Sequence, residues 1–317
     1  MLQPFNRRSF LQVAAVAAAS AFAPRWARSQ AAALPDRILQ ARAAALNAPI
    51  STTKLYDNVY LLQNGVGGNM ALQTGADGNI LVDSSFATNV AKTREAIAAV
   101  SHDAPDALIN THWHYDHTDG NEGLHAAGFS IFAHSKTRER MSTPQSIAFF
   151  HFVVPPSPAA ALPTITFDEA MHTWHNGDSL DLVHFDPAHT DTDIYIHFHN
   201  ANVLHVGDIW FNNMYPFIDE STGGHIGGMI RGAEKALAVA DDKTKIIPGH
   251  GPLGSKADLQ KYRDMLSTIR DKVAALKHSG LTEPEAVAKK PTSDFDAEWG
   301  KGFVNGDVIA GIVYRSL

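Results

Sequence analysis

The segment at residues 111–121 reads T-H-W-H-Y-D-H-T-D-G-N and places three histidines and an aspartate within six residues. His112 and His114 are two positions apart, so in an extended segment their side chains project to the same side. Asp116 and His117 follow, where the chain begins to turn. Imidazole nitrogens and carboxylate oxygens suit zinc, and a catalytic zinc ion keeps one position open for water. Because coordination lowers the pKa of that water toward ~7, the segment predicts a site that generates hydroxide at neutral pH, and one loop could serve two metals.

Further segments supply the context that this motif needs. The chain has 17 histidines, most of which must be solvated or hydrogen-bonded rather than metal-bound. P-A-H-T-D-T-D puts His189 just before a predicted strand, H-V-G-D-I-W puts Asp208 just after one, and I-I-P-G-H-G-P puts His250 just after another. Since the strand ends of packed sheets can converge, these residues are candidates for the same site.

The elements that must position these residues alternate between strands and helices in two similar rounds. We expect strands at residues 58–63, 70–74, 79–82, 107–110, 130–133, 164–167, 179–184, 194–199, 203–206 and 245–247, and helices at 88–100, 121–127, 135–149, 229–240 and 256–278. This order predicts two sheets packed together with helices outside. The proline-rich segment 153–163 between the rounds is expected to be a surface connection, with a lid as the alternative.

Taken in chain order, the motifs resemble the metallo-β-lactamase superfamily. The resemblance is carried by L-V-D at residues 81–83, T-H-W-H-Y-D-H, A-H-T at 188–190, G-D at 207–208 and G-H-G at 249–251. It implies an α/β fold of the αββα type, in which helices flank two mixed β-sheets and a dinuclear site lies along one edge. It covers nearly the whole chain after the leader, so residues 32–317 are expected to form a single domain.

The resemblance also implies a role for each motif residue. One zinc ion would be held by His112, His114 and His189, the other by Asp116, His117 and His250, and Asp208 would bridge both. Asp116 would also orient the hydroxide and could carry its proton, so Asp116 and Asp208 are the expected catalytic carboxylates. Asp83 matches the family's first acidic position, which steadies the ligand loop; the alternative is an aspartate that only closes a strand.

Two departures from the lactamase pattern concern the substrate. Many antibiotic-hydrolysing members place a cysteine on the second metal, and this chain has none. Asp208 resembles the bridging aspartate of glyoxalase II-like thioesterases, lactonases and phosphodiesterases. The G-x-G-G loop at residues 65–68, where lactamases carry a substrate flap, keeps β-lactam hydrolysis open. This loop, within residues 63–69, is short, so a fairly open mouth is expected.

We therefore expect a zinc hydrolase that cleaves an amide-like or ester-like bond in a small-molecule substrate. β-Lactamase-like activity is the leading hypothesis, and lactonase, thioesterase or phosphodiesterase activity is the alternative. A different class of protein, a periplasmic metal-binding accessory protein without catalytic activity, is the third hypothesis.

The first 31 residues predict a twin-arginine export signal. N-R-R-S-F-L-Q precedes an apolar run at residues 13–23, which is too short to span a bilayer as a helix, so stable membrane anchoring is not expected. The expected partner is the twin-arginine export machinery, with release near Ser29 or Ala31 of a folded periplasmic or secreted protein. Removing the leader takes out four arginines and no acid, so the net charge falls from −7 to −11. Such a charge offers no electrostatic basis for binding nucleic acid.

Other residues near the motifs are expected to pack or face solvent rather than act in the site. They are His225, Trp113, Tyr115, Trp210 and Tyr215. The H-F-H histidines at 197–199 are expected to face solvent, and His172 and His175 to lie in a turn-rich stretch.

Overall fold

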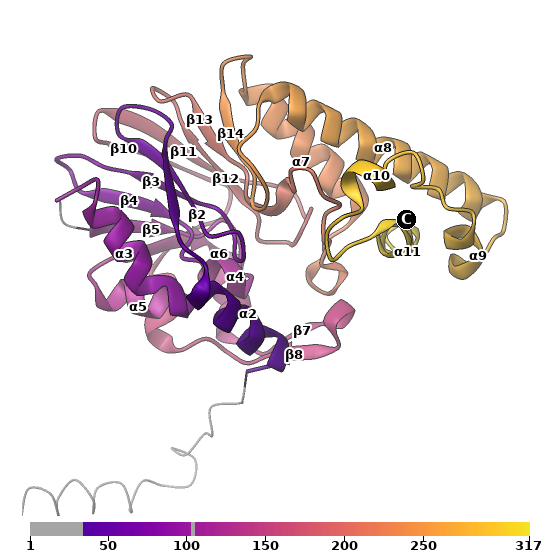
Figure 1. Cartoon of the computed structure of the whole chain (residues 1–317), viewed down its shortest axis with the longest axis horizontal. Helices are drawn as coiled ribbons and strands as arrows, with labels where there is room; N and C mark the ends of the chain where they lie inside the picture. Colours follow the sequence, from indigo (N-terminus) through magenta and orange to yellow (C-terminus); the bar gives the residue numbers. More distant parts are fainter. Residues whose placement is uncertain (1–33, 103–104) are drawn as a thin grey trace, which may run out of the picture. The chain divides into compact units, whose positions relative to one another are not determined.

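The computed structural model describes residues 34–102 and 105–317 (Figure 1). The predicted export signal therefore lies outside the described residues. Within them, no helix is both long enough and apolar enough to cross a membrane.

Two large sheets form the centre of the fold. The first has the order β1-β2-β3-β4-β5-β6-β9 and runs antiparallel from β1 to β4 and parallel from β4 to β9. The second has the order β10-β11-β12-β13-β14, with only β13 and β14 parallel. The strands of the first sheet are β1 (Ser51–Lys54), β2 (Val59–Gln63), β3 (Met70–Gln73), β4 (Asn79–Val82), β5 (Pro105–Ile109), β6 (Ser130–His134) and β9 (Ile165–Phe167). Those of the second are β10 (Ala170–His175), β11 (Asp178–His184), β12 (Ile194–Phe198), β13 (Val203–His205) and β14 (Lys245–Ile247). A separate hairpin joins β7 (Gln145–Ile147) to β8 (Phe152–Val154).

Helices cover the outer face of each sheet, which makes the predicted αββα order. They are α2 (Asp36–Asn47), α3 (Val90–Ala98), α4 (Tyr115–Thr118), α5 (Asn121–Ala126), α6 (Ser135–Ser142), α7 (Ile226–Val239), α8 (Lys256–His278), α9 (Glu283–Ala288), α10 (Asp296–Trp299) and α11 (Gly306–Arg315). Consecutive residues of a strand pack into different layers, because their side chains alternate between the two faces of the sheet. Leu61 and Val203 pack between the sheets, whereas Leu62 packs on the side of α3 and α5, and Leu204 on the side of α7 and α8. The α/β sandwich expected from the motifs is confirmed.

Three expectations about individual elements were wrong. The helix expected at 135–149 ends at Ser142, and Thr143 is extended (φ −130°, ψ 157°) because it precedes Pro144. The chain then forms the β7–β8 hairpin, so the segment 153–163 begins in a strand instead of being wholly loop. His172 and His175 lie in strand β10, which pairs only with β11 and alternates between exposed and half-buried residues.

Strand ends deliver the motif residues to one place. Parallel strands end at the same edge of a sheet, and the parallel pair β4–β5 is followed by Asp83 and by the T-H-W-H-Y-D-H segment. In the second sheet the parallel pair β13–β14 is followed by Asp208 and His250. A backbone hydrogen bond of 2.8 Å from Ile194 N–H to the Thr111 carbonyl connects the two sheets at this edge.

Candidate metal centre

The seven residues expected to bind metal come together in two groups. His112, His114, His189 and Asp208 offer ligand atoms that all lie within 4.8 Å of one another, and Asp116, His117 and His250 do the same. The two sets of three side chains are those that the motif resemblance implied, and Asp208, the expected bridging residue, clusters with the first set. The residues come from the segments that follow β5, β13 and β14, including the short helix α4 after β5, and from the loop before β12, so only the packing of both sheets creates the site.

Asp208 lies between the two groups. One carboxylate oxygen, Oδ2, is 3.8 Å from His112 Nε2 and 3.5 Å from His189 Nε2. The other oxygen, Oδ1, is 3.2 Å from His117 Nε2 and 3.5 Å from His250 Nε2. Each oxygen therefore faces a different group, as a bridging ligand requires.

Asp83 orients His117 from outside the cluster. Its Oδ2 accepts a hydrogen bond of 2.7 Å from His117 Nδ1, and its two oxygens also accept from Thr111 N–H and Thr111 Oγ1, both at 2.8 Å. Thr111 Oγ1 is in turn 3.0 Å from His112 Nδ1. With both Nδ1 atoms engaged outward as donors, the Nε2 lone pairs of His112 and His117 face the cluster.

His189 and His114 are oriented in the same way by groups that the sequence did not indicate. His189 Nδ1 donates to the Phe217 carbonyl at 2.9 Å, and His114 Nε2 lies 3.1 Å from Asp219 Oδ2. His114 Nδ1 and His189 Nε2 then face each other at 2.8 Å inside the cluster. Asp219 carries no motif signal, because its role arises only where its loop returns beside the site.

Carboxylates and histidines in the site shift one another's pKa values in opposite directions. Burial raises the pKa of Asp208, but His250 and His117 lower it more, and the net shift is well below the usual value. Burial also raises the pKa of Asp116, and His117 and His250 bring it down to about 2. Burial lowers the pKa of His250, yet Asp208 and Asp116 raise it to about 9. Buried, ionised carboxylates of this kind require cations beside them.

The residues present fit divalent metal ions. His112 Nε2 and Asp208 Oδ1 are buried and have no hydrogen-bond partner among the described residues, which is costly unless another group satisfies them. Ligands about 2.0 Å from a tetrahedral zinc ion lie about 3.3 Å apart, close to the 2.8–3.8 Å separations between donor atoms here. The His and Asp clusters can therefore bind metal ions.

Two glycines make room for this packing. A Cβ at Gly68 would overlap the His117 ring, and one at Gly249 would overlap Asp208 Oδ1. Gly68 belongs to the short G-x-G-G loop, and Gly249 to G-H-G. Both motifs are thus explained by the close approach of backbone to ligand side chains.

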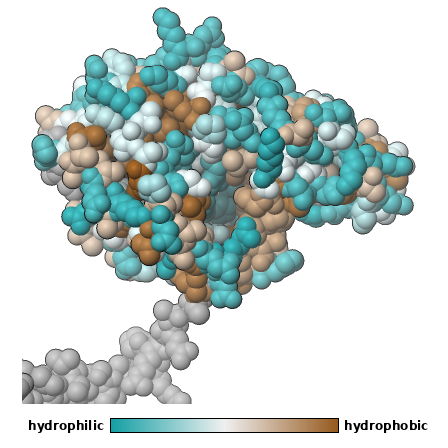
Figure 2. Space-filling view, viewed as in Figure 1, coloured by the Kyte–Doolittle hydropathy of each residue, from teal (hydrophilic) through white to brown (hydrophobic). Residues whose placement is uncertain are grey.

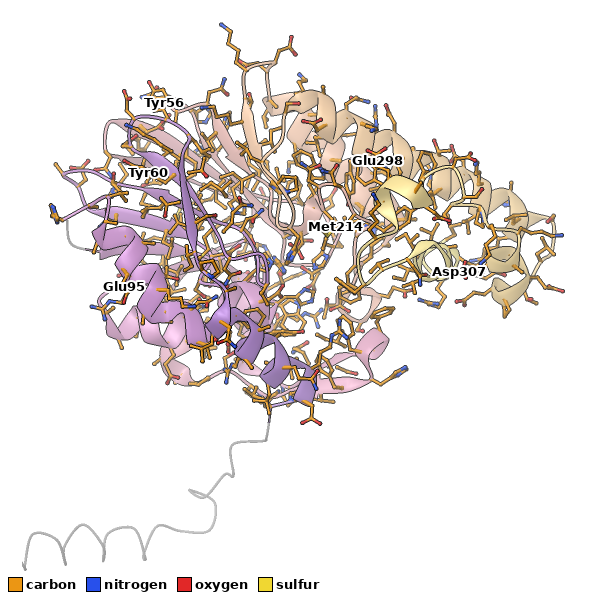
Figure 3. All side chains as sticks on the ribbon, viewed as in Figure 1. Tyr56, Tyr60, Glu95, Met214, Glu298 and Asp307 are labelled. Atoms are coloured by element: carbon orange, nitrogen blue, oxygen red, sulfur yellow. The ribbon has the colours of Figure 1, made fainter. Side chains whose placement is uncertain are left out.

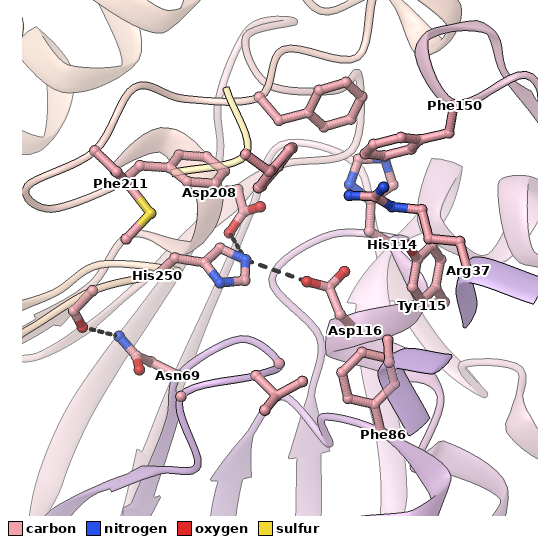
Figure 4. Close-up of a pocket in the computed structure, with 18 of the residues that line it drawn as sticks. Arg37, Asn69, Phe86, His114, Tyr115, Asp116, Phe150, Asp208, Phe211 and His250 are labelled. Atoms are coloured by element: carbon pink, nitrogen blue, oxygen red, sulfur yellow. Dashed lines mark hydrogen bonds and ion pairs between the residues drawn. The ribbon is translucent and has the colours of Figure 1, made fainter. Parts of the chain in front are cut away.

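A cavity of about 430 Å³ opens onto the site and has largely aromatic walls (Figure 4). Figure 2 shows hydrophobic residues bordering a hollow on the drawn face. The apolar lining consists of Ala41, Val66, Phe86, Tyr115, Ile147, Phe150, Phe211, Met214, Phe217 and Phe303, of which Met214 is labelled near the middle of Figure 3. Polar lining comes from Arg37, Gln63, Asn69, His114, Asp116, Asp208 and His250.

The expectation for Tyr115 was wrong, since it lines this cavity, whereas Trp113, Trp210 and Tyr215 are buried in the core as expected. The phenylalanines that line the walls were missed. The run A-F-F-H-F at residues 148–152 was the available signal, but the expected helix 135–149 includes only its first two residues and nothing in the run indicates a cavity wall.

Four histidines outside the cluster have other contacts or positions. His225 caps α7 by accepting a hydrogen bond from Gly228 N–H at 3.1 Å. His172 and His199 pair with Asp181, at 2.6 and 3.0 Å. His197 is buried, with 8% of its surface exposed, so the expectation that it faces solvent was wrong.

Comparisons with known proteins agree with this geometry. Residues 64–250 match the family model described as metallo-beta-lactamase superfamily. No curated protein matches the chain. Solved structures with a similar fold include the DIM-1 metallo-beta-lactamase, with 18% identity, a TM-score of 0.54 and coverage of 69% of this chain and 98% of that one. A metallo-beta-lactamase from Pontibacter korlensis has 15% identity, a TM-score of 0.55 and coverage of 69% and 99%.

The stereoselective inverting sec-alkylsulfatase Pisa1 from Pseudomonas sp. is also similar, with 18% identity and a TM-score of 0.63. That match covers 91% of this chain and 53% of the sulfatase, so the chain spans about half the length of that protein. These likenesses concern the fold. Because the family model covers more than half of the chain and includes all seven clustered residues, the chain belongs to the metallo-β-lactamase superfamily.

Proposed function

We propose that this chain is a dinuclear zinc hydrolase that cleaves an amide-like or ester-like bond. The observation that carries the proposal is the position of Asp208 between two complete groups of donor atoms, one oxygen facing each group. All donors are imidazole or carboxylate, a set that suits zinc.

In this proposal, the first ion is held by His112, His114 and His189, the second by Asp116, His117 and His250, and Asp208 contacts both. When bound, two zinc ions supply a water-derived nucleophile at neutral pH and a Lewis acid for the substrate oxygen. The chain's own residues orient the reactants and move protons.

Asp116 is the proposed proton carrier. Its side chain is 22% exposed and lines the cavity, whereas the Asp208 side chain is only 4% exposed. Asp116 Oδ2 is held 3.3 Å from His250 Nε2, so the carboxylate is fixed in direction while still reachable from the cavity. It is therefore placed to orient the attacking water, accept its proton and return it to the leaving group.

Asn69 has a different part in the cavity. Its Nδ2 donates to the carbonyls of Pro248 and Gly251, both at 2.9 Å, and its Oδ1 accepts from Gln63 at 2.8 Å. Since both amide hydrogens are used within the protein, Asn69 fixes the loop that carries His250 rather than contacting substrate.

β-Lactam hydrolysis remains the leading proposal for the substrate, supported by two lactamases among the structural neighbours. Ester-type substrates, namely lactones, thioesters or phosphodiesters, are the second candidate. The absence of cysteine and the carboxylate between the groups support this second candidate. A sulfate ester belongs in the same test, because one neighbour is a sec-alkylsulfatase.

The test is a panel assay on the mature protein. A chromogenic β-lactam, an acyl lactone, a thioester, a phosphodiester and a secondary alkyl sulfate are compared for wild type, His112→Ala, Asp208→Ala and the control His172→Ala, which changes an exposed histidine. We expect at least one substrate to be cleaved by wild type and by the control, and rates at least about 100-fold lower in the two site variants. No metal-dependent turnover of any substrate would reject the hydrolase proposal and favour the accessory protein.

Metal analysis tests the cofactor separately. We expect about two zinc ions per chain in wild type, and loss of binding in the first group for His112→Ala. Tight binding of a single ion, or of iron, would contradict the dinuclear zinc site whatever the activity.

We also propose that the protein is exported folded by the twin-arginine machinery to the periplasm or beyond. The support is the order of N-R-R-S-F-L-Q and the apolar run in the sequence. Replacing Arg7 and Arg8 together by lysine should keep the protein in the cytoplasm, with its leader uncleaved, in a cell-fractionation immunoblot. Unchanged export of that double variant would refute this route.

A further inference from the structure

The cavity combines apolar walls with one fixed positive charge. Among the described residues that line it, Arg37 is the only arginine or lysine. Its guanidinium carbon lies 4.1 Å from the centre of the Phe150 ring and 5.6 Å from that of Phe303. Figure 4 draws the Arg37 side chain between Phe150 and Tyr115, on the side of the cavity that carries His114 and Asp116.

Arg37 has no acidic partner in the described part of the chain, unlike most other arginines there. Arg42, Arg140, Arg263, Arg270 and Arg315 all form ion pairs. Besides its ring contacts, the Arg37 guanidinium has a side-chain hydrogen bond with Tyr115. A guanidinium has five N–H donors, so others along its edge can still match the two oxygens of a carboxylate or the oxygens of a sulfate.

The helix that carries Arg37 is held firmly against the metal site. On α2, Arg42 Nε donates to Asp119 Oδ2 at 2.8 Å, two residues after His117. Thr88 Oγ1 donates to the Arg42 carbonyl at 2.8 Å, and Ile38 is fully buried beside Arg37. The backbone that carries Arg37 is therefore held beside the mouth, and the exposed side chain is placed by its contacts with Phe150 and Phe303.

The walls around this cation come partly from the superfamily match at residues 64–250 and partly from the segments before and after it. Arg37 and Ala41 precede that region, and Phe303 follows it. Phe150 and Phe217 complete the aromatic wall, with ring centres 5.1 Å apart, and Phe303 lies 6.0 Å from Phe150. Arg37, Ala41 and Phe303 thus extend the cavity beyond the segment that carries the metal-site residues, and we expect substrate selection at this part of the mouth.

We propose that Arg37 is a specificity-determining residue that binds the anionic group of an amphiphilic substrate, whose aryl or alkyl body lies against the phenylalanine wall. The substrate class is a small organic acid or sulfate with its negative charge away from the bond that is cleaved. That this ligand is a substrate rests on the proposed hydrolytic function, but its binding does not depend on turnover.

Binding is measured by calorimetry with four probes that separate charge from apolar body. 4-Phenylbutyrate and 4-phenylbutyl sulfate carry both features, 4-phenylbutanol carries only the apolar body, and acetate carries only the charge. Each probe is titrated into the mature protein with and without added zinc, because a carboxylate could also bind the metal ions directly. The variants are Arg37→Gln, Arg37→Lys, Phe150→Ala and the control Arg94→Gln, which changes an exposed helical arginine away from the cavity.

We expect wild type to prefer the two phenyl anions over 4-phenylbutanol with and without zinc. Arg37→Gln should weaken the binding of the two phenyl anions by about three- to tenfold and that of 4-phenylbutanol by less than about twofold. Arg37→Lys should recover part of that loss, Phe150→Ala should weaken all three phenyl probes, and Arg94→Gln should behave as wild type. The preference between carboxylate and sulfate identifies the natural anion.

Equal weakening of the phenyl anions and 4-phenylbutanol in Arg37→Gln would overturn the proposal, since it would mean that Arg37 only supports the wall. Unchanged anion binding in that variant, or no preference of wild type for the anions, would also overturn it. Because these outcomes are read without turnover, a protein that binds the anions but hydrolyses nothing would refute the proposed function and leave the anion subsite standing.

Discussion

Replacing Asp83 by asparagine should separate metal binding from folding. Asp83 is fully buried in the left-handed region (φ 63°), which asparagine tolerates, so the backbone can stay in place. Wild-type Asp83 accepts from Thr111 N–H, Thr111 Oγ1 and His117 Nδ1. If the asparagine oxygen keeps the contact to Thr111 N–H, its NH₂ group faces His117 Nδ1. Two donors cannot share that contact, so the His117 proton moves to Nε2, which is the atom that faces Asp208.

The size of the effect follows from this tautomer change. Metal binding needs the His117 proton back on Nδ1, and this costs the hydrogen bond between Nδ1 and the asparagine NH₂ group. Groups that orient metal ligands typically contribute a factor of about 10–100 in metal affinity. That range corresponds to about 1.4–2.7 kcal/mol. Asp83→Ala should be worse for folding, because it leaves three donors unmet and puts alanine at positive φ, and we expect a loss of about 3–5 kcal/mol in unfolding free energy.

The assay is competition for zinc with a chromogenic chelator, accompanied by chemical denaturation of the metal-free protein. The matched control is Asp181→Asn, which changes another carboxylate between histidines, His172 and His199, that is partly exposed and belongs to neither metal-binding group. We expect Asp83→Asn to weaken one of two zinc ions by 10- to 100-fold. Wild-type affinity in Asp83→Asn, or the same small loss as in Asp181→Asn, would refute the assigned role of Asp83.

Three further predictions concern stability and packing. The rings of His134 and His184 stack at 3.8 Å, and burial, the charge of His134 and the nearby Lys136 and Lys235 lower the pKa of His184 to about 4. As pH falls, the unfolded chain therefore takes up a proton on this histidine before the folded chain does, so the unfolding free energy should fall by about 1–2 kcal/mol between pH 6.5 and 4. Denaturation curves across this window give the unfolding free energy at each pH for wild type and His184→Gln. An equal dependence on pH in the two proteins would contradict the prediction. Gly249→Ala puts a methyl group against a carboxylate of the site and should lower zinc affinity more than tenfold in the chelator competition. The control is Gly302→Ala, where a Cβ would make only ordinary van der Waals contacts, the nearest at 3.6 Å; an equal loss of affinity in the two variants would contradict the prediction. Removing zinc with a chelator should lower the melting temperature by several degrees, reversibly on adding zinc back, and an unchanged temperature would argue against tight binding.

Local sequence signals were sufficient to predict an element or a motif where neighbouring residues carry the pattern. The helix at 256–278 and the strand at 245–247 have the expected bounds, because a long amphipathic pattern with a Ser255–Asp258 capping box and a short apolar run leave few alternatives. The residues that the motif resemblance named also lie together in two groups able to bind metal. The helix expected at 135–149 was wrong because Pro144 overrides the apolar pattern around it.

The sequence could not reveal partners brought together by long-range packing. Asp219 supports His114 although the two are 105 residues apart, and nothing around Asp219 resembles a motif. The aromatic wall is likewise assembled from segments before, within and after the family region, with Arg37 added by a helix that the sequence did not predict.

The sequence by itself therefore determined the superfamily and the layered fold, and it named the seven residues that lie together in groups able to bind metal, because each motif is short and lies near a strand end. The tertiary structure decided which nitrogen of each histidine faces the cluster, which oxygen of Asp208 faces which group and what surrounds the mouth. These features depend on distances of 3–4 Å between side chains far apart in the chain. Such distances are set by how the two sheets and α2 pack, and no local pattern of residues encodes them.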